Sequence, residues 1–385
     1  MFKKIKTITL FSIKKDFQAG LNVALLAIPQ GMAYALIAGL PLYYGLLASG
    51  IAALLGGIFG GGRFITLGPT NATAVLLFGV FAQMNMVAND GTILESALLI
   101  LPSILLCSGL FLVIAGILRI SFLVKFISRT VVTAYITAAA LLIICNQVRS
   151  VLGLESSHPL GSNFFETAVF IFRHLLDFSI SSVMLSFFSA TVYLILQKKF
   201  RVLPNVAITL ILGSLVGQIL LNYQYSVTCL QPFHSSYAPI SIPHFELSIK
   251  HWQVILQTSV ALSLLCLIEG LSIGKSLASR CGKRIDSDRE AFSFGMGNIG
   301  CAFLSGMPAS GSLTRSSLNV NSGAKSGVSN LFTGILVLCG YFMLGDLVSY
   351  IPVSVLATLV VFIGLSLCAK TLIVWSAYFV IALPQ

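Results

Sequence analysis

The chain has 385 residues, of which 57% are hydrophobic and 9% are charged, and its mean hydropathy is +0.96. Soluble domains contain about 45–50% apolar and about 25% charged residues, so this composition excludes an ordinary soluble protein and a disordered chain. The net charge of +11 would suit a nucleic-acid partner, but the basic residues lie between apolar runs, which excludes that class and leaves a polytopic membrane protein.

The first half of the chain contains seven apolar runs, each close to the length of about 20 residues that crosses a bilayer as a helix. They lie at 17–37, 43–60, 67–84, 94–118, 122–146, 178–197 and 203–221. A polar stretch from Asn222 to Lys250 follows, and six further runs lie at 252–274, 291–305, 309–321, 328–347, 352–368 and 371–383, two of them short. We therefore divide the chain into a leader (1–16), a first repeat (17–221), an extracytoplasmic loop (222–250) and a second repeat (251–385).

The basic residues fall on alternate connections. If the N-terminus is cytoplasmic, the connections on that side hold 19 of the 23 Lys and Arg residues, and Arg149, Arg173 and Lys250 lie on the other side. The remaining cation, Arg315, lies at membrane depth. The pattern predicts a multi-pass protein of the inner (plasma) membrane with a cytoplasmic N-terminus.

Two short segments, one in each half, resemble each other. Leu67–Thr73 and Met307–Thr314 both place a proline before small and hydroxyl residues. Proline fits the first turn of a helix and cannot continue one from upstream, so each segment predicts a half-helix that starts partway through the membrane after extended chain. Two apolar runs precede the first segment and nine precede the second, so the two segments enter the membrane from opposite sides and the two halves are inverted relative to each other.

The start of a half-helix is favourable for an anion because its backbone N–H groups are unpaired and carry the positive end of the peptide dipole. Arg315 adds a full positive charge there. If Pro308 opens the second half-helix, Arg315 lies about two turns inside it and Ser312, three residues earlier, lies on the same side. This arrangement predicts a site for an anionic substrate.

Other kinds of site find little support in the sequence. The eight cysteines form no C-x-x-C pair and all five histidines lie in or beside predicted outside loops, so we expect no metal, no cofactor and no enzyme activity. Gly295–Gly300 matches the dinucleotide pattern G-x-G-x-x-G, but it lies in an apolar span without a βαβ unit, and we interpret its glycines as helix-packing positions.

Several motifs resemble the sulfate permease (SulP) family of anion transporters, the solute carrier family 26 type. The family's first signature is similar to Gly20–Ala35, Ala38–Pro41, Tyr44–Leu46 and Gly68–Thr70, and its second to Asp286–Glu290, Gly297–Gly300, Gly306–Pro308 and Ser310–Ser316. The resemblance implies an all-α polytopic membrane protein with the 7+7 inverted-repeat transporter fold. In this fold, core and gate domains carry two half-helices at the membrane midplane.

The resemblance also implies which residues bind the anion. They are Gln30 and Tyr34 on the first span, Thr70 and Asn71 on the third, and Ser312, Thr314 and Arg315 on the tenth. Glu269 occupies the place where related transporters carry a coupling carboxylate. It is the only acidic residue deep inside an apolar run, and at that depth it either pairs with a cation or takes up a proton.

We therefore expect a secondary active transporter of sulfate, bicarbonate or a dicarboxylate. It would work by proton-coupled symport or anion exchange, through an alternating-access elevator or rocking motion. A nucleobase or ascorbate carrier of the same fold, or an anion channel, is the alternative. The resemblance suggests a homodimer in the lipid bilayer. The sequence stops at Gln385, before the fourteenth span and the STAS domain that family members carry, so we expect an incomplete second repeat.

Overall fold

The computed structural model describes residues 10–87, 92–120, 141, 144–145, 147–154, 164–199, 205–230, 240–243, 249–345, 347–362 and 365. Most of the predicted span 122–146 and all of the predicted span 371–383 lie outside the described residues.

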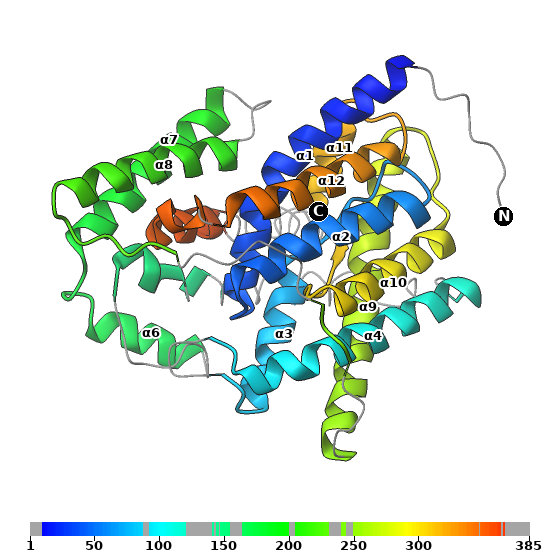
Figure 1. Cartoon of the computed structure of the whole chain (residues 1–385), viewed down its shortest axis with the longest axis horizontal. Helices are drawn as coiled ribbons and strands as arrows, with labels where there is room; N and C mark the ends of the chain where they lie inside the picture. The colour runs from blue at the N-terminus through cyan, green and yellow to red at the C-terminus, as the bar shows by residue number, and fades with distance from the viewer. Residues whose placement is uncertain are drawn as a thin grey trace, which may run out of the picture. The chain divides into compact units, whose positions relative to one another are not determined.

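The described chain is almost entirely helical (Figure 1). The first half contains α1 (Leu10–Ile37), α2 (Leu42–Phe59), α3 (Asn71–Gln83), α4 (Glu95–Ile117), α6 (Phe164–Arg173), α7 (Ile180–Lys199) and α8 (Asn205–Asn222). The second half contains α9 (Ile249–Arg280), α10 (Ser287–Phe303), α11 (Leu313–Asn321), α12 (Val328–Leu344), the 3₁₀ turn η2 (Leu347–Tyr350) and a short apolar helix at Val353–Phe362.

Six of the described helices are long and apolar enough to cross a membrane. They are Ser12–Ile37, Leu42–Phe59, Glu95–Ile117, Ile180–Lys199, Asn205–Asn222 and His251–Arg280. Each coincides with an apolar run predicted from the sequence. Helix α1 begins at Leu10, inside the segment expected to be a leader, and α6 was not predicted because its 10 residues are too few for a span.

The chain divides into two compact units. The first comprises residues 1–80, 93–126 and 234–345, and within it α4 packs on α9 and α10, while α12 packs on α1 and α2. The second comprises residues 81–92, 127–233 and 346–385, and within it α7 and α8 lie side by side (Figure 1).

Helices α4 and α10 approach each other at glycines. A Cβ atom at Gly295 would lie 2.6 Å from the carbonyl oxygen of Gly109, and one at Gly109 would lie 2.9 Å from the carbonyl oxygen of Gly295. Both distances are shorter than real Cβ contacts, so only glycine permits this spacing. The interpretation of Gly295 as a helix-packing position is confirmed.

Two very short strands pair within the first unit. Strand β1 (Leu67–Gly68) pairs antiparallel with β2 (Ser310–Gly311), with Leu67 opposite Gly311 and Gly68 opposite Ser310. All four residues are buried. The extended chain predicted before each half-helix is therefore present, and the two extended segments satisfy each other's backbone hydrogen bonds.

Candidate substrate-binding site

Helices α3 and α11 both start directly after these strands. Helix α3 begins at Asn71, two residues after Pro69. Helix α11 begins at Leu313, with Ser312 as its N-cap residue, so the prediction that Pro308 opens it is wrong. Ser310 and Gly311 pair with β1 instead, and Arg315 consequently lies in the first turn of α11 rather than about two turns inside it.

The two helix starts differ in how many of their N–H groups are already used. At α3, Thr70 and Thr73 cap each other: the backbone N–H of Thr70 donates to Thr73 Oγ1 at 3.1 Å, and that of Thr73 donates to Thr70 Oγ1 at 3.4 Å. At α11, the backbone N–H groups of Leu313, Thr314 and Arg315 have no acceptor within the described part of the chain. The start of α11 is therefore the stronger anion-attracting end.

Arg315 is fully buried, and only part of its guanidinium group is engaged. Its Nε donates to Gln30 Oε1 at 3.4 Å, and its Cζ lies 6.0 Å from the centre of the Tyr34 ring. Among the described residues, neither Nη1 nor Nη2 has a hydrogen-bond partner. The N–H groups of Nη1 and Nη2 are thus free to donate hydrogen bonds to an anion.

Gln30 connects helix α1 to the start of α11. Its Nε2 donates to Thr314 Oγ1 at 3.4 Å while its Oε1 accepts from Arg315, so its amide orientation is determined from both sides. The Thr314 hydroxyl also lies 3.2 Å from that of Ser312. The predicted residues Gln30, Tyr34, Ser312, Thr314 and Arg315 therefore form one contact group.

Glu269 and Thr70 form a second group. Glu269 lies on α9, and its Oε2 accepts a hydrogen bond from Thr70 Oγ1 at 3.0 Å. No ion pair joins it to Arg315 in the described structure, so the two charges do not neutralise each other directly. Asn71 joins neither group, and both polar atoms of its buried amide lack partners among the described residues.

Two asparagines outside the predicted set hold the extended segments. Asn298, on α10, donates to the Ala309 carbonyl at 2.9 Å and accepts from the Ala309 N–H at 3.0 Å. Asn330, on α12, donates to the Ile65 carbonyl at 2.8 Å and accepts from Thr66 Oγ1 at 2.8 Å. The only sequence signal for these roles was a polar amide in an apolar helix, which does not identify the backbone atoms that it contacts.

Comparison with known proteins agrees with this architecture. The Sulfate permease family profile matches residues 13–378. Similar proteins include the chloroplastic sulfate transporter 4.1 of Arabidopsis thaliana, at 30% identity over 90% of this chain and 50% of that protein. The sodium-independent sulfate anion transporter of Bos taurus is 29% identical, over 92% of this chain and 61% of that protein. This chain thus spans only about half to two thirds of the relatives' length.

Solved structures show the same fold. The transmembrane domain of a cyanobacterial bicarbonate transporter, BicA, gives a TM-score of 0.81 at 21% identity and covers 94% of this chain and 90% of that one. The murine Solute Carrier 26 family member A9 anion transporter in its inward-facing state gives a TM-score of 0.81 at 21% identity. It covers 97% of this chain and 63% of that one. The predicted 7+7 inverted-repeat fold is confirmed, and the chain belongs to the Sulfate permease family.

Proposed function

We propose that this chain is a secondary active transporter of small anions and that the substrate binds at Arg315. The observation that carries the proposal is the fully buried guanidinium group whose Nη1 and Nη2 have no partner among the described residues. A buried charge is costly unless a counter-charge or hydrogen-bond acceptors compensate for it. A bound oxyanion would supply both, and it would also accept from the unpaired N–H groups at the start of α11.

The geometry favours an oxyanion over a neutral substrate. Because Nε of Arg315 is occupied by Gln30, the guanidinium group presents Nη1 and Nη2 as a pair, which suits two oxygen atoms of one ligand. The related proteins named above are sulfate and bicarbonate transporters, which supports the same class of substrate. Sulfate, bicarbonate and small dicarboxylates all fit this description.

We propose that Glu269 couples transport to protons. Thr70 is adjacent to the first residue of α3 and donates to Glu269 Oε2, so a change in the carboxylate's protonation state alters a hydrogen bond at the edge of the site. One anion and one proton would bind together, the two units would move relative to each other, and both ligands would be released on the opposite side. This proposal also includes a cytoplasmic N-terminus, a homodimer and the two predicted repeats, 17–221 and 251–385.

The test is uptake of labelled sulfate, bicarbonate and succinate into proteoliposomes, with and without an inward proton gradient. Arg315→Ala should weaken the apparent affinity about a hundredfold, because hydrogen bonds to charged groups each contribute about 1.5–3 kcal/mol. Arg173→Ala, which removes an exposed arginine at the end of α6, is the matched control and should transport normally.

The same assay separates coupling from binding. Glu269→Gln should abolish gradient-driven accumulation while leaving anion exchange between equal concentrations, and Glu95→Gln, at the exposed start of α4, should change neither. Full accumulation by Glu269→Gln would remove Glu269 from the coupling mechanism. Competition by uracil but not by any anion would indicate a nucleobase carrier, and flux that does not saturate would indicate a channel.

A further inference from the structure

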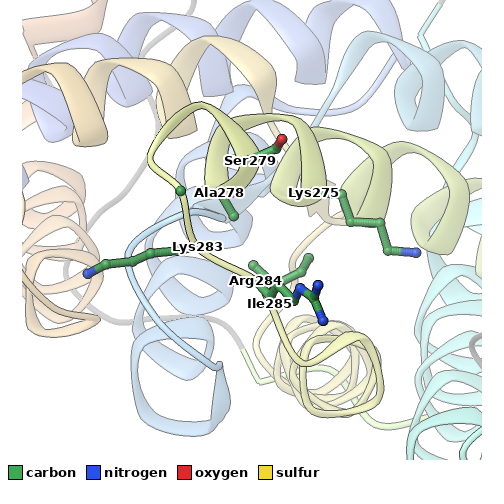
Figure 2. A pocket seen from close by; sticks show the side chains of 7 residues that line it. Lys275, Ala278, Ser279, Lys283, Arg284 and Ile285 are labelled. Carbon is green, nitrogen blue, oxygen red and sulfur yellow. The ribbon is translucent and has the colours of Figure 1, made fainter.

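A pocket of about 410 Å³ lies at the C-terminal end of α9, where the chain turns towards α10 (Figure 2). Three basic side chains line it, Lys275, Lys283 and Arg284, together with the hydroxyl-bearing Ser279. Those of Lys275 and Arg284 extend to the same side of the loop, while that of Lys283 extends the other way (Figure 2). No acidic side chain is among the residues that line the pocket.

The local backbone explains why these cations gather. Helix α9 ends at Arg280, and Gly282 adopts φ +64°, a conformation that reverses the chain after a helix. The Lys283 N–H then donates to the Ala278 carbonyl at 2.8 Å. This bond places Lys283 and Arg284 beside the last turns of α9, from which Lys275 projects.

The floor of the pocket is apolar and firmly packed. Ala278 and Ile285 line the pocket, and both belong to a cluster that contains the buried side chains of Phe64 and Leu277. The three basic residues therefore line a depression with a packed apolar base and do not lie on an isolated loop. Such a pocket combines an apolar base with a cationic rim.

The positive charge of the rim is not compensated locally. Within the described structure, Lys275, Lys283 and Arg284 make no hydrogen bond or ion pair through their side chains. Of the nearest acidic residues, Asp286 caps α10 by accepting from the N–H groups of Asp288 and Arg289, each at 3.2 Å. Like charges around one depression repel each other, and a bound anion would relieve that repulsion.

We propose that this pocket binds a phosphate group, separately from the transport site at Arg315. Lysine and arginine are the usual protein ligands of phosphate, and basic pockets at the cytoplasmic side of membrane helices suit anionic headgroups. The excess of basic residues in cytoplasmic connections would account for their presence in this loop, but it does not require them to line one pocket. The phosphate belongs either to an anionic phospholipid or to a free phosphate compound.

The test is thermal unfolding of the purified full chain in neutral detergent, titrated with dihexanoyl phosphatidylglycerol, dihexanoyl phosphatidylcholine or inorganic phosphate at constant ionic strength. The variant K275Q/R284Q removes the two cations that extend to the same side. The matched control K198Q/K199Q removes two exposed cations at the end of α7, which do not line this pocket.

We expect phosphatidylglycerol to raise the unfolding temperature saturably and more strongly than phosphatidylcholine. Its apparent Kd should be about 25-fold higher for K275Q/R284Q, since each basic side chain near a membrane surface contributes about a factor of five, and unchanged for K198Q/K199Q. If K275Q/R284Q does not fold, Arg284→Gln alone should give about a fivefold increase.

Inorganic phosphate distinguishes the two sources of the ligand. A shift with inorganic phosphate that K275Q/R284Q loses and Arg315→Gln retains would assign the pocket to free phosphate compounds. A shift lost only in Arg315→Gln would belong to the transport site and would contradict a phosphate site at α9. Equal responses of K275Q/R284Q and K198Q/K199Q to every ligand would overturn the proposal.

Discussion

The guanidinium group of Arg315 lies directly against the backbone of Gly68. A Cβ atom built at Gly68 would overlap Nη1 of Arg315, so any larger residue at this position would have to displace the charge. Nη1 is also one of the two atoms without a partner in the described structure. At the scale of single residues, the absence of a side chain at position 68 is therefore what makes room for the cation.

Gly68→Ala should weaken anion binding about tenfold or more without unfolding the protein, because one added methyl group in a buried site typically costs ~1–3 kcal/mol. The measurement is the apparent Kd for the transported anion, with thermal unfolding as the test of folding. Gly79→Ala on α3 is the matched control, since a Cβ there meets nothing within 4 Å. Unchanged affinity in a folded Gly68→Ala protein would contradict the close approach of Arg315.

At the scale of elements, the site depends on the two extended segments that precede α3 and α11. Local sequence rules do not fully predict where these segments end and the helices begin. The proline rule came within two residues of the start of α3, which follows Pro69 at Asn71, but failed at Pro308, four residues before the N-cap of α11. The reason is that Ala309 is held by the amide of Asn298, and Ser310 and Gly311 pair with β1. The Asn298 amide lies one helix earlier and β1 lies more than two hundred residues away, and together they satisfy backbone groups that a helix would have used.

Asn298→Ala should destabilise the protein by about 1–3 kcal/mol, because it leaves the buried N–H of Ala309 without a partner and its carbonyl with only the thiol of Cys266 as donor. The measurement is the free energy or midpoint of unfolding in detergent. Asn222→Ala, at the exposed C-terminal end of α8, removes an amide from a helix end and should change stability little. Equal effects of the two substitutions would show that the Asn298 amide does not hold this segment.

At the scale of the whole molecule, every residue predicted to bind the anion or couple its transport lies in one of the two compact units. Residues 30, 34, 70, 71, 269, 312, 314 and 315 all belong to the unit formed by residues 1–80, 93–126 and 234–345. The candidate site is thus assembled within one unit, from helices of both sequence halves.

The membrane orientation can be tested with a native cysteine. Helix α9 has 32 residues and is about 48 Å long, enough to cross the hydrocarbon core, so its two ends emerge on opposite sides. Cys281, just after α9, is exposed and lies between the apolar runs 252–274 and 291–305, a connection that is cytoplasmic if the N-terminus is cytoplasmic. A membrane-impermeant maleimide should label it in inside-out vesicles and not in intact cells.

Two variants control this experiment. Cys281→Ser should lose the label, and in that background Tyr223→Cys, at an exposed position after α8, should be labelled in intact cells instead. Labelling of Cys281 from outside intact cells would reverse the predicted topology.

The amino-acid sequence by itself determined the class of protein, most helix positions and the prominence of Arg315 and Glu269. These features follow from local quantities: the length of apolar runs, the position of prolines and the rarity of a charge at membrane depth. The other candidate site residues were implied by the family resemblance. Only the tertiary structure decided that α11 starts at Leu313, that Gln30 occupies one nitrogen of Arg315, and that Gly68 makes room for another. Each of these depends on contacts between segments more than two hundred residues apart, and neither composition nor periodicity specifies which distant atoms meet.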